Sequence, residues 1–466
     1  MSNPGESNTT LIENRAQLVD VLARGCKPQE EWRIGTEHEK FGFRLPERAR
    51  GKLKPFAPPA YEPEGIGALL GALEGPDWQA IRDNGHLIGL KGAGPHKGRS
   101  ISLEPAGQFE LSGAPVRTVQ ETEQEMIAHF QQITEPAREL GLGFAPLGFQ
   151  PLWERDSIPW MPKSRYAIMR RYMPKVGRRG LDMMTRTCTV QVNLDFSSED
   201  DMARKMRVSL ALQPLITALM ANSPFADGRP TGRLSNRAYI WLDTDNQRSG
   251  QPTLFFEEGF GFEQYVDWAL DVPMYFVHRD GRNIDAAGCS FRKWLDGVEQ
   301  EPLVGLRPTV GDFEDHLTTL FPDVRLKQFL EMRGADAGRP DMMVAQSAFW
   351  VGLLYDPDVL LEVERVVKEQ SWLHYQSLAE LVVEQAMDAP FPGGLRALAK
   401  RVLELSEQGL QKRGFGEEYY LAPLYEIADG AKTQAERWLE RYHGVWKEDV
   451  RHIFREADIV LQGGVR

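Results

Sequence analysis

The clearest hydrophobic pattern in the chain lies in residues 185–196, where apolar and polar residues alternate strictly from Thr187 onward. An alternation with a period of two residues is typical of a β-strand that buries one face and leaves the other face polar. The apolar face carries Cys188, Val190, Val192 and Leu194, and the polar face carries Thr189, Gln191, Asn193 and Asp195. We therefore predict a strand here whose polar face can take part in chemistry.

Several further segments have the pattern of strands. Residues 33–43 and 86–91 read as single strands, and residues 100–112 read as two extended pieces joined by Pro-Ala-Gly. Residues 325–333 are predicted to form another strand, and a short strand is predicted near Tyr239 within a loop-rich region.

Helical periodicity dominates the rest of the chain. We predict helices near residues 10–22, 65–75 and 116–140, a helix capped by Ser197 or Ser198 that runs to about residue 220, and an almost entirely helical region from residue 341. Strands mixed with helices, followed by helices alone, favour an α+β fold over a doubly wound parallel sheet. The expected organisation is a disordered lead (1–9), an α+β core (10–340) and a helical region packed on the same unit (341–466).

Composition narrows the class of protein. Hydrophobic residues make up 42% of the 466 residues and charged residues 26%, so a disordered chain is excluded. The net charge of −12 argues against nucleic-acid and membrane-surface binding. Three cysteines, a polar N-terminus and the lack of a long apolar stretch predict reduced thiols and a cytoplasmic protein.

Carboxylates recur on the polar faces of the predicted strands. Glu37 and Glu39 are two residues apart and point the same way, Glu104 and Glu110 flank the Pro-Ala-Gly kink, and Glu331 lies in the last predicted strand. A solvated charged face of an antiparallel sheet would explain each segment taken singly. Taken together, the carboxylates also fit a cavity for Mg²⁺ and a nucleotide, because Mg²⁺ prefers hard oxygen ligands and neutralises crowded acids.

Other signals are weaker. The Gly-rich segment 89–98 carries Lys91 and Lys97 and could cradle phosphate or be a plain surface loop. Arg165 opens a basic run, and Arg237 lies close to Trp241, so each could bind an anion or serve packing alone. His38 points away from its neighbouring glutamates, Cys188 reads as a buried thiol, and no nucleophile or zinc motif is present.

Long stretches of the chain resemble the glutamate–cysteine ligase family in its plant and proteobacterial branch. The matching segments include IGTEHEKFGF, SLEPAGQFELSGAP, RYAIMRRYMPKVGRRGLDMMTRTCTVQVNLDFSSE and RLKQFLEMRGAD. The resemblance implies a curved, mainly antiparallel sheet of the glutamine synthetase–guanidino kinase type with flanking helices. It also implies ATP-dependent joining of the γ-carboxylate of L-glutamate to the amine of L-cysteine through a γ-glutamyl phosphate, the first step of glutathione synthesis.

Roles for individual residues follow from the same resemblance. It implies two or three Mg²⁺ ions with ATP, held by Glu37, Glu39, Glu104, Glu110 and Glu331. It places Arg333 opposite the transferred phosphate as a catalytic residue beside Glu39, and Arg165, Arg237, Trp241 and Asn193 in the glutamate site. Gln191 is an expected nucleotide contact, although relatives with a histidine ligand at this position leave its role open. Lys91 and Lys97 are expected nucleotide contacts from the Gly-rich segment itself, which is longer and more basic than the family leads us to expect.

Two alternatives remain open at this stage. The chain could ligate glutamate to another amine, because no residue in the sequence is specific for recognising the thiol of cysteine. It could also be a non-catalytic nucleotide-binding regulator. Cys26, Cys188 and Cys289 do not match the regulatory cysteine pairs of plant members, so no disulfide switch of that type is expected. A monomer or a homodimer is expected.

Overall fold

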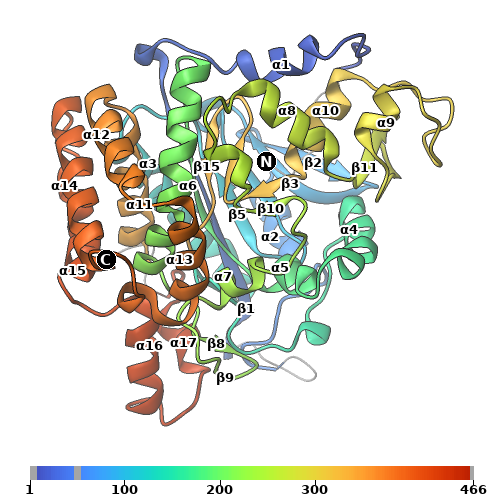
Figure 1. Ribbon diagram of the computed structural model, residues 1–466. Helices are drawn as coiled ribbons and strands as arrows, with labels where there is room; N and C mark the ends of the chain where they lie inside the picture. The colour runs from blue at the N-terminus through green and yellow to red at the C-terminus, as the bar shows by residue number, and fades with distance from the viewer. Residues whose placement is uncertain (1–7, 47–53, 462–466) are drawn as a thin grey trace.

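The computed structural model describes residues 8–46 and 54–461. Its described part contains a nine-stranded sheet in the order β14-β15-β7-β1-β5-β4-β3-β2, with β6 paired to β1, and helices surround this sheet (Figure 1). Each neighbouring pair of strands in this sheet is antiparallel. The strands are β1 (Ile34–Arg44), β2 (Trp78–Asp83), β3 (His86–Gly92), β4 (Ser100–Leu103), β5 (Phe109–Ser112), β6 (Leu142–Ala145), β7 (Val190–Leu194), β14 (Val324–Leu326) and β15 (Leu330–Met332).

Strand β1 is the centre of the sheet and aligns the polar faces of its neighbours. Its first half pairs with β7 on one side and β5 on the other, and its last residues pair with β6. The register sets Glu37 opposite Gln191 and Glu39 opposite Glu110. Residues that are directly opposite share one face of a sheet, so this register gathers polar residues from distant parts of the sequence.

The two faces of β1 meet different surroundings. Thr36, His38 and Lys40 face the helices α3 (Val119–Glu139) and α11 (Pro340–Leu354): the Thr36 hydroxyl lies 3.1 Å from that of Ser347, and the His38 ring packs edge-on against Phe130. The other face of β1 carries Glu37 and Glu39 toward a cavity. The prediction that His38 points away from the glutamates is therefore confirmed.

Two long helices begin with a side-chain cap. Thr118 and Glu121 form a reciprocal capping box at the start of α3. The Ser198 hydroxyl accepts a hydrogen bond from the Asp201 amide at the start of α6 (Glu199–Leu219). The cap at Ser198 is one of the two that the sequence predicts, whereas the cap at Thr118 was not predicted and α3 begins after the predicted start at residue 116.

The cavity side of the sheet is covered by short elements with tight connections. They are α4 (Ser164–Val176), α5 (Gly180–Arg186), α7 (Asn236–Trp241), α10 (Val310–Thr318), the hairpin of β11 (Phe276–Arg279) and β12 (Arg282–Asp285), and the two-residue strands β10 (Ser249–Gly250) and β13 (Phe321–Pro322). Further elements lie at the periphery: α1 (Ala16–Ala23), α2 (Ile66–Leu73), α8 (Phe262–Asp271), α9 (Phe291–Leu295), β8 (Phe225–Ala226) and β9 (Arg229–Pro230).

Every described element from α11 onward is helical, and these helices gather on one side of the molecule in Figure 1. They are α12 (Pro357–Lys368), α13 (Trp372–Gln385), α14 (Leu395–Arg413), α15 (Ala422–Ala428), α16 (Gln434–His443) and α17 (His452–Glu456). Val190 of β7 and Leu403 of α14 belong to one hydrophobic core. The C-terminal helices therefore support the sheet directly.

Three predicted strands differ from the structure. The segment near Tyr239 is the helix α7, because Ser235 caps it by accepting a hydrogen bond from the Ala238 amide, a local contact that outweighs the strand preference of its aromatic residues. Residues 325–333 form the hairpin β14–β15 rather than one strand, and the predicted strand 185–196 is shorter because its first residues end α5. Most of the expected N-terminal lead (residues 1–7) lies outside the described residues.

Candidate active site

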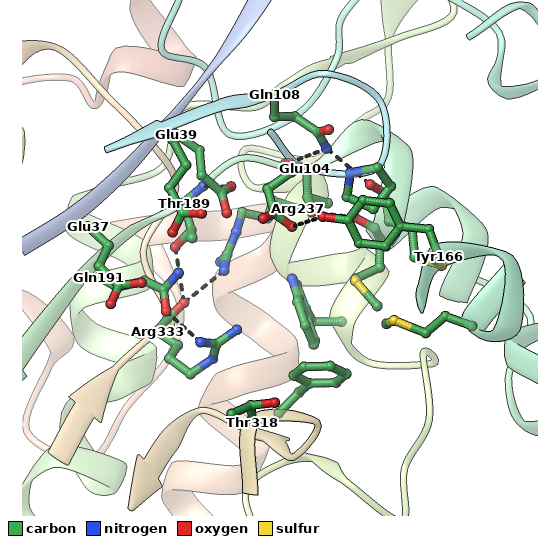
Figure 2. A pocket seen from close by; sticks show the side chains of 18 of the residues that line it. Glu37, Glu39, Glu104, Gln108, Tyr166, Thr189, Gln191, Arg237, Thr318 and Arg333 are labelled. Atoms are coloured by element: carbon green, nitrogen blue, oxygen red, sulfur yellow. Dashed lines mark hydrogen bonds between the residues drawn. The ribbon is translucent and has the colours of Figure 1, made fainter. Parts of the chain in front are cut away.

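A cavity of about 120 Å³ opens between the polar face of the sheet and the helices α4, α5 and α7. Figure 2 shows Glu37, Glu39 and Glu104 directed into the space that also receives Arg237 and Arg333. Residues of the predicted site that line the cavity are Glu37, Glu39, Glu104, Glu110, Arg165, Gln191, Arg237, Trp241 and Arg333. The sheet and the helices α4 and α7 therefore bring together most of the residues singled out in the sequence.

The carboxylates Glu39 and Glu110 repel each other across the β1–β5 pair. Burial, together with Glu110 and Glu104, raises the pKa of Glu39 well above its usual range. Burial and the charges of Glu104 and Glu37 raise the pKa of Glu110 to about 8. A site that pushes carboxyl groups toward their neutral form is one that a bound cation would stabilise.

Each carboxylate is oriented by a neighbouring donor. The Thr189 amide donates to Glu39 Oε2 at 2.9 Å, and the Ser102 hydroxyl donates to Glu110 Oε2 at 2.7 Å. The Tyr166 hydroxyl lies 3.2 Å from Glu104 Oε2. These bonds hold the carboxylates in place while oxygens remain directed at the cavity.

Asn193 supports the site from its edge. Its Nδ2 donates to Glu37 Oε1 at 2.9 Å, and Asn193 does not line the cavity. The residue expected in the glutamate site thus orients a carboxylate in this structure.

Two arginines form the opposite wall of the cavity. Arg333 donates to Gln191 Oε1 and, at 3.0 Å, to Glu331 Oε1. Arg237 is buried and donates to the backbone carbonyls of Arg333 at 2.7 Å and Gly334 at 3.1 Å. The Arg237 side chain therefore also fixes the chain that leaves β15 and carries Arg333.

Glu331 departs from the role expected for it. Its carboxylate is fully buried and accepts from Arg325 at 2.6 and 2.9 Å and from Arg333, and it does not line the cavity. Burial would raise the pKa of Glu331, but Arg325, Lys327 and Arg333 together hold it well below its usual range. In this structure the Glu331 carboxylate anchors Arg325 and Arg333, and its expected role as a metal ligand stays a prediction.

Lys91 and Lys97 also depart from expectation. Both side chains are exposed, and neither lines the cavity or the larger chamber described below. The Gly-rich segment lies beyond the edge of the site because β3 is separated from β1 by β4 and β5.

Several residues that line the cavity were not predicted as site residues, among them Gln108, Tyr166, Thr189 and Arg325. Thr189 lies on the polar face of the predicted strand, so the alternation of polar and apolar residues could have identified it as a site residue. Gln108 is positioned by donating to the backbone carbonyls of Met184 and Thr187, both at 3.1 Å, which are contacts that sequence spacing cannot indicate.

The donor set fits divalent metal. Within residues 8–46 and 54–461, no three His, Cys, Asp or Glu side chains form a complete metal-binding group. Mg²⁺ needs only one or two protein carboxylates when phosphate and water complete its shell. Burial and neighbouring carboxylates raise the pKa values of Glu39 and Glu110, and a bound divalent cation would favour their ionised forms.

A larger chamber of about 400 Å³ adjoins the carboxylate cavity. The two spaces share Arg237, Trp241, Phe321 and Arg333 as a common wall. The Trp241 indole N–H is buried without a hydrogen-bond partner among the described residues. A ligand that extends from the larger chamber to the carboxylates would therefore pass Arg237 and Arg333.

The fold and the site together define an α+β protein that is equipped to hold a metal-bound phosphate compound beside arginines. The family model for "Glutamate-cysteine ligase family 2" matches residues 33–456, and the chain belongs to this family. A chloroplastic glutamate–cysteine ligase of Medicago truncatula is 51% identical over 98% of this chain and 87% of its own length. That of Nicotiana tabacum is 50% identical over 98% and 85%.

A solved structure supports the fold. A glutamate–cysteine ligase of Francisella tularensis in complex with AMP has a TM-score of 0.52 with 12% sequence identity, and the match covers 93% of this chain and 89% of that one. The predicted family and the predicted antiparallel α+β fold are thus confirmed.

The predicted cytoplasmic location is contradicted, because the relatives from Medicago truncatula and Nicotiana tabacum are both named chloroplastic. A low cysteine content indicates a reducing environment and does not distinguish one reducing compartment from another. Within the part of the chain that the structure describes, no helix has both the length and the apolar character needed to cross a membrane.

Proposed function

We propose that this protein is an ATP-dependent ligase that joins the γ-carboxylate of L-glutamate to the amine of L-cysteine, the first step of glutathione synthesis. The observation that carries the proposal is the cavity in which Glu39, Glu104 and Glu110 meet Arg237 and Arg333. About half of the residues are identical to those of ligases with this named activity.

The reaction needs such a cavity because a carboxylate is a poor acyl donor. An oxygen of the glutamate γ-carboxylate attacks the γ-phosphorus of ATP, and the bond from phosphorus to the bridging oxygen of ADP breaks. The amine of cysteine then attacks the acyl carbon of γ-glutamyl phosphate, phosphate leaves and the amine loses a proton. The protein contributes positioning and electrostatic stabilisation instead of a covalent nucleophile.

The metal-binding residues in this proposal are Glu37, Glu39, Glu104 and Glu110, which would hold two or three Mg²⁺ ions together with the phosphates of ATP. Bound Mg²⁺ would neutralise the phosphate oxygens and the crowded carboxylates. The donors Thr189, Ser102 and Asn193 hold these carboxylates in position before the substrates arrive.

The arginines provide the positive charge that two anionic substrates require. Arg333 faces the transferred phosphate, with Gln191 holding its guanidinium. Arg165 and Arg237 bind the carboxylates of glutamate, and Trp241 forms a wall of that site.

The larger chamber is the proposed site of the nucleotide. Its volume of about 400 Å³ exceeds that of the carboxylate cavity, and its shared wall places Arg333 between the two spaces. Phosphates that extend from this chamber meet the carboxylates directly. The exposed Lys91 and Lys97 have no part in this arrangement.

Product analysis with each substrate omitted in turn tests the proposal. We expect ADP, phosphate and γ-glutamylcysteine in equal amounts, with formation dependent on ATP, glutamate, cysteine and Mg²⁺. Ligation of a different amine in place of cysteine would identify the alternative acceptor. Nucleotide binding by calorimetry without turnover for any amine would identify a non-catalytic regulator.

A further inference from the structure

A separate chamber of about 150 Å³ lies on the opposite face of the sheet from the carboxylate cavity. Two consecutive residues of β5 show this arrangement, because Glu110 lines the carboxylate cavity and Leu111 lines the chamber. This back chamber shares no lining residue with the carboxylate cavity or with the larger chamber that adjoins the cavity. It is therefore a space that the proposed reaction does not use.

The walls of the back chamber come from helix α3 and from the end of the Gly-rich stretch. His96 and Arg99 contribute the wall on the side of the Gly-rich stretch, and Glu125 and Gln132 contribute that of α3. Ala128 of α3 also lines the chamber and is exposed, so the chamber opens to solvent at this helix. The basic stretch that lies away from the active site thus borders a cavity of its own.

Backbone amides of the Gly-rich stretch are already engaged. The amides of Ala93, His96 and Arg99 each donate to a backbone carbonyl, so they are not free to cradle a phosphate. Recognition of a ligand in the back chamber therefore falls to side chains.

Two buried side chains line the chamber with polar atoms that lack partners. Trp78 is 4% exposed and His129 is 3% exposed. Neither the indole N–H of Trp78 nor either ring nitrogen of His129 has a hydrogen-bond partner among the described residues. Burial and the charge of Lys40 lower the pKa of His129 well below its usual value, so at neutral pH the ring has one N–H and one lone pair. A ligand that pairs with these atoms would relieve the cost of burying them.

Arg99 supplies the positive charge of the chamber. Its Nε donates to Glu125 Oε1 at 2.6 Å, and its Nη1 lies 3.1 Å from His96 Nδ1. Glu125 Oε1 also accepts from the Ala114 amide at 2.9 Å, so this carboxylate is held in place. A guanidinium that is anchored through Nε keeps further N–H donors on its terminal nitrogens for an anion.

We propose that the back chamber binds a small organic monocarboxylate with an apolar body. Arg99 and the Trp78 indole N–H donate to the carboxylate of this ligand. Leu111 and the stacked rings of Trp78 and His96 contact its apolar body. The inference is independent of the proposed ligase function, because none of these residues takes part in the proposed reaction.

The charges and donors of the chamber favour this class of ligand over two others. Glu125 repels a second negative charge, which disfavours phosphate relative to a monocarboxylate. A cation would have to compete with Arg99 for Glu125, and the Trp78 indole can only donate.

The test is a titration of the full-length protein with benzoate, followed by saturation-transfer NMR. We expect the wild type to bind benzoate with a Kd of about 1 mM or lower. Trp78→Phe keeps an aromatic ring and removes the unpartnered N–H, so binding should weaken at least ~3-fold. Arg99→Gln removes the charge, so binding should weaken at least ~10-fold. The matched control is Arg365→Gln, which also removes an arginine paired with a glutamate but on the exposed surface, and it should bind benzoate as the wild type does.

Arg237→Ala distinguishes the back chamber from the proposed glutamate site, which also offers arginines to a carboxylate. Benzoate binding that persists in Arg237→Ala and weakens in Trp78→Phe supports the back chamber. A crystal structure of the wild type soaked with benzoate locates the ligand directly, also if Arg99→Gln does not fold. The benzoate carboxylate should lie within hydrogen-bond distance of Arg99.

Four outcomes would overturn the assignment. They are affinity unchanged in both Trp78→Phe and Arg99→Gln, loss of binding in Arg237→Ala alone, inorganic phosphate bound as tightly as benzoate, and a soaked crystal in which the chamber holds only water. None of these measurements depends on turnover, so failure of the ligase function would be seen separately in the product analysis.

Discussion

The residues that decide the chemistry are carboxylates placed where they destabilise one another. Glu39 and Glu110 are paired across β1 and β5, and Glu104 adds a third negative charge from the turn after β4. The pKa values of Glu39 and Glu110 are both raised, so burial and mutual repulsion favour the protonated form of these carboxyl groups when no metal is bound. Two consequences can be measured.

The first concerns Glu39→Gln. We expect kcat to fall by at least ~10²-fold, because a carboxylate that would hold Mg²⁺ beside the phosphates of ATP is lost. The thermal unfolding midpoint without Mg²⁺ should stay equal or rise, since the substitution removes, at nearly constant volume, a group whose ionised form is penalised by burial and by Glu110 and Glu104. Glu30→Gln, on the exposed surface, is the control for both measurements. A large loss of stability with normal turnover would contradict the assigned role.

The second concerns pH. The pKa of Glu110 in the folded protein is about 8, above the value of about 4.3 of an unfolded chain. The folded state therefore binds more protons between these values, so this group's contribution to stability falls as pH rises from about 4.3 to 8. Glu110→Gln should flatten that part of the curve.

Bound Mg²⁺ should change the same dependence of stability on pH. Because protons and Mg²⁺ compete for the carboxylates, the rise in unfolding temperature caused by Mg²⁺ should be larger at pH 8 than at pH 6. Differential scanning calorimetry of wild type and Glu110→Gln measures both effects. A Mg²⁺ effect that is identical at the two pH values, or unaffected by the substitution, would argue against a metal site at Glu110.

At the level of elements, β1 shows how much the sequence can predict. The spacing of Glu37 and Glu39 fixes a shared face, and apolar alternation indicates β5 and β7, so the gathering of carboxylates is predictable once the strands pair. The helix α7 could not be predicted in this way. Its aromatic residues favour a strand, and only the cap at Ser235 together with the buried partner Asp336 determines the helix.

The contacts of Glu331 with arginines also could not be predicted from the sequence. They depend on the turn between β14 and β15, which places Arg325 directly opposite Glu331. A single predicted strand over residues 325–333 separates these two side chains by six positions and cannot indicate the pair. The position of the Gly-rich segment away from the site likewise depends on strand order and not on its composition.

The cap of α7 gives a prediction at this scale. The Ser235 hydroxyl accepts from the Ala238 amide at 3.1 Å and donates to Asp336 Oδ1 at 2.9 Å. Ser235→Ala should cost about 1–3 kcal/mol of unfolding free energy and raise the KM for glutamate, because α7 carries Arg237. Ser371→Ala, at a helix start without a side-chain cap bond, is the control for urea unfolding. Equal stability losses in both variants would show that the cap does not matter.

At the level of the whole molecule, the C-terminal helices and the sheet share one core, and the site lies on the opposite face of β1 from α3 and α11. The site is therefore supported by packing that is contributed by residues more than 300 positions away from β1 in the sequence, such as Ser347 beside Thr36. Family membership covers this whole arrangement, since the matched region runs from residue 33 to residue 456.

The pKa values of the three thiols lead to a prediction of how the activity responds to oxidation. Burial raises the pKa of Cys26, Cys188 and Cys289, so little reactive thiolate is present at neutral pH. We expect activity with and without thiol reductant to differ by less than about twofold. A large loss on oxidation that reductant reverses would show that a cysteine switch controls this chain after all.

The central claim is that glutamate is activated by phosphoryl transfer within the carboxylate cavity. The most direct measurement supplies glutamate labelled with ¹⁸O in its γ-carboxylate, together with ATP, cysteine and Mg²⁺, and follows the label by mass spectrometry. The account predicts one labelled oxygen in each phosphate released, in step with ADP and γ-glutamylcysteine. Unlabelled phosphate, or AMP and pyrophosphate in place of ADP, would contradict it.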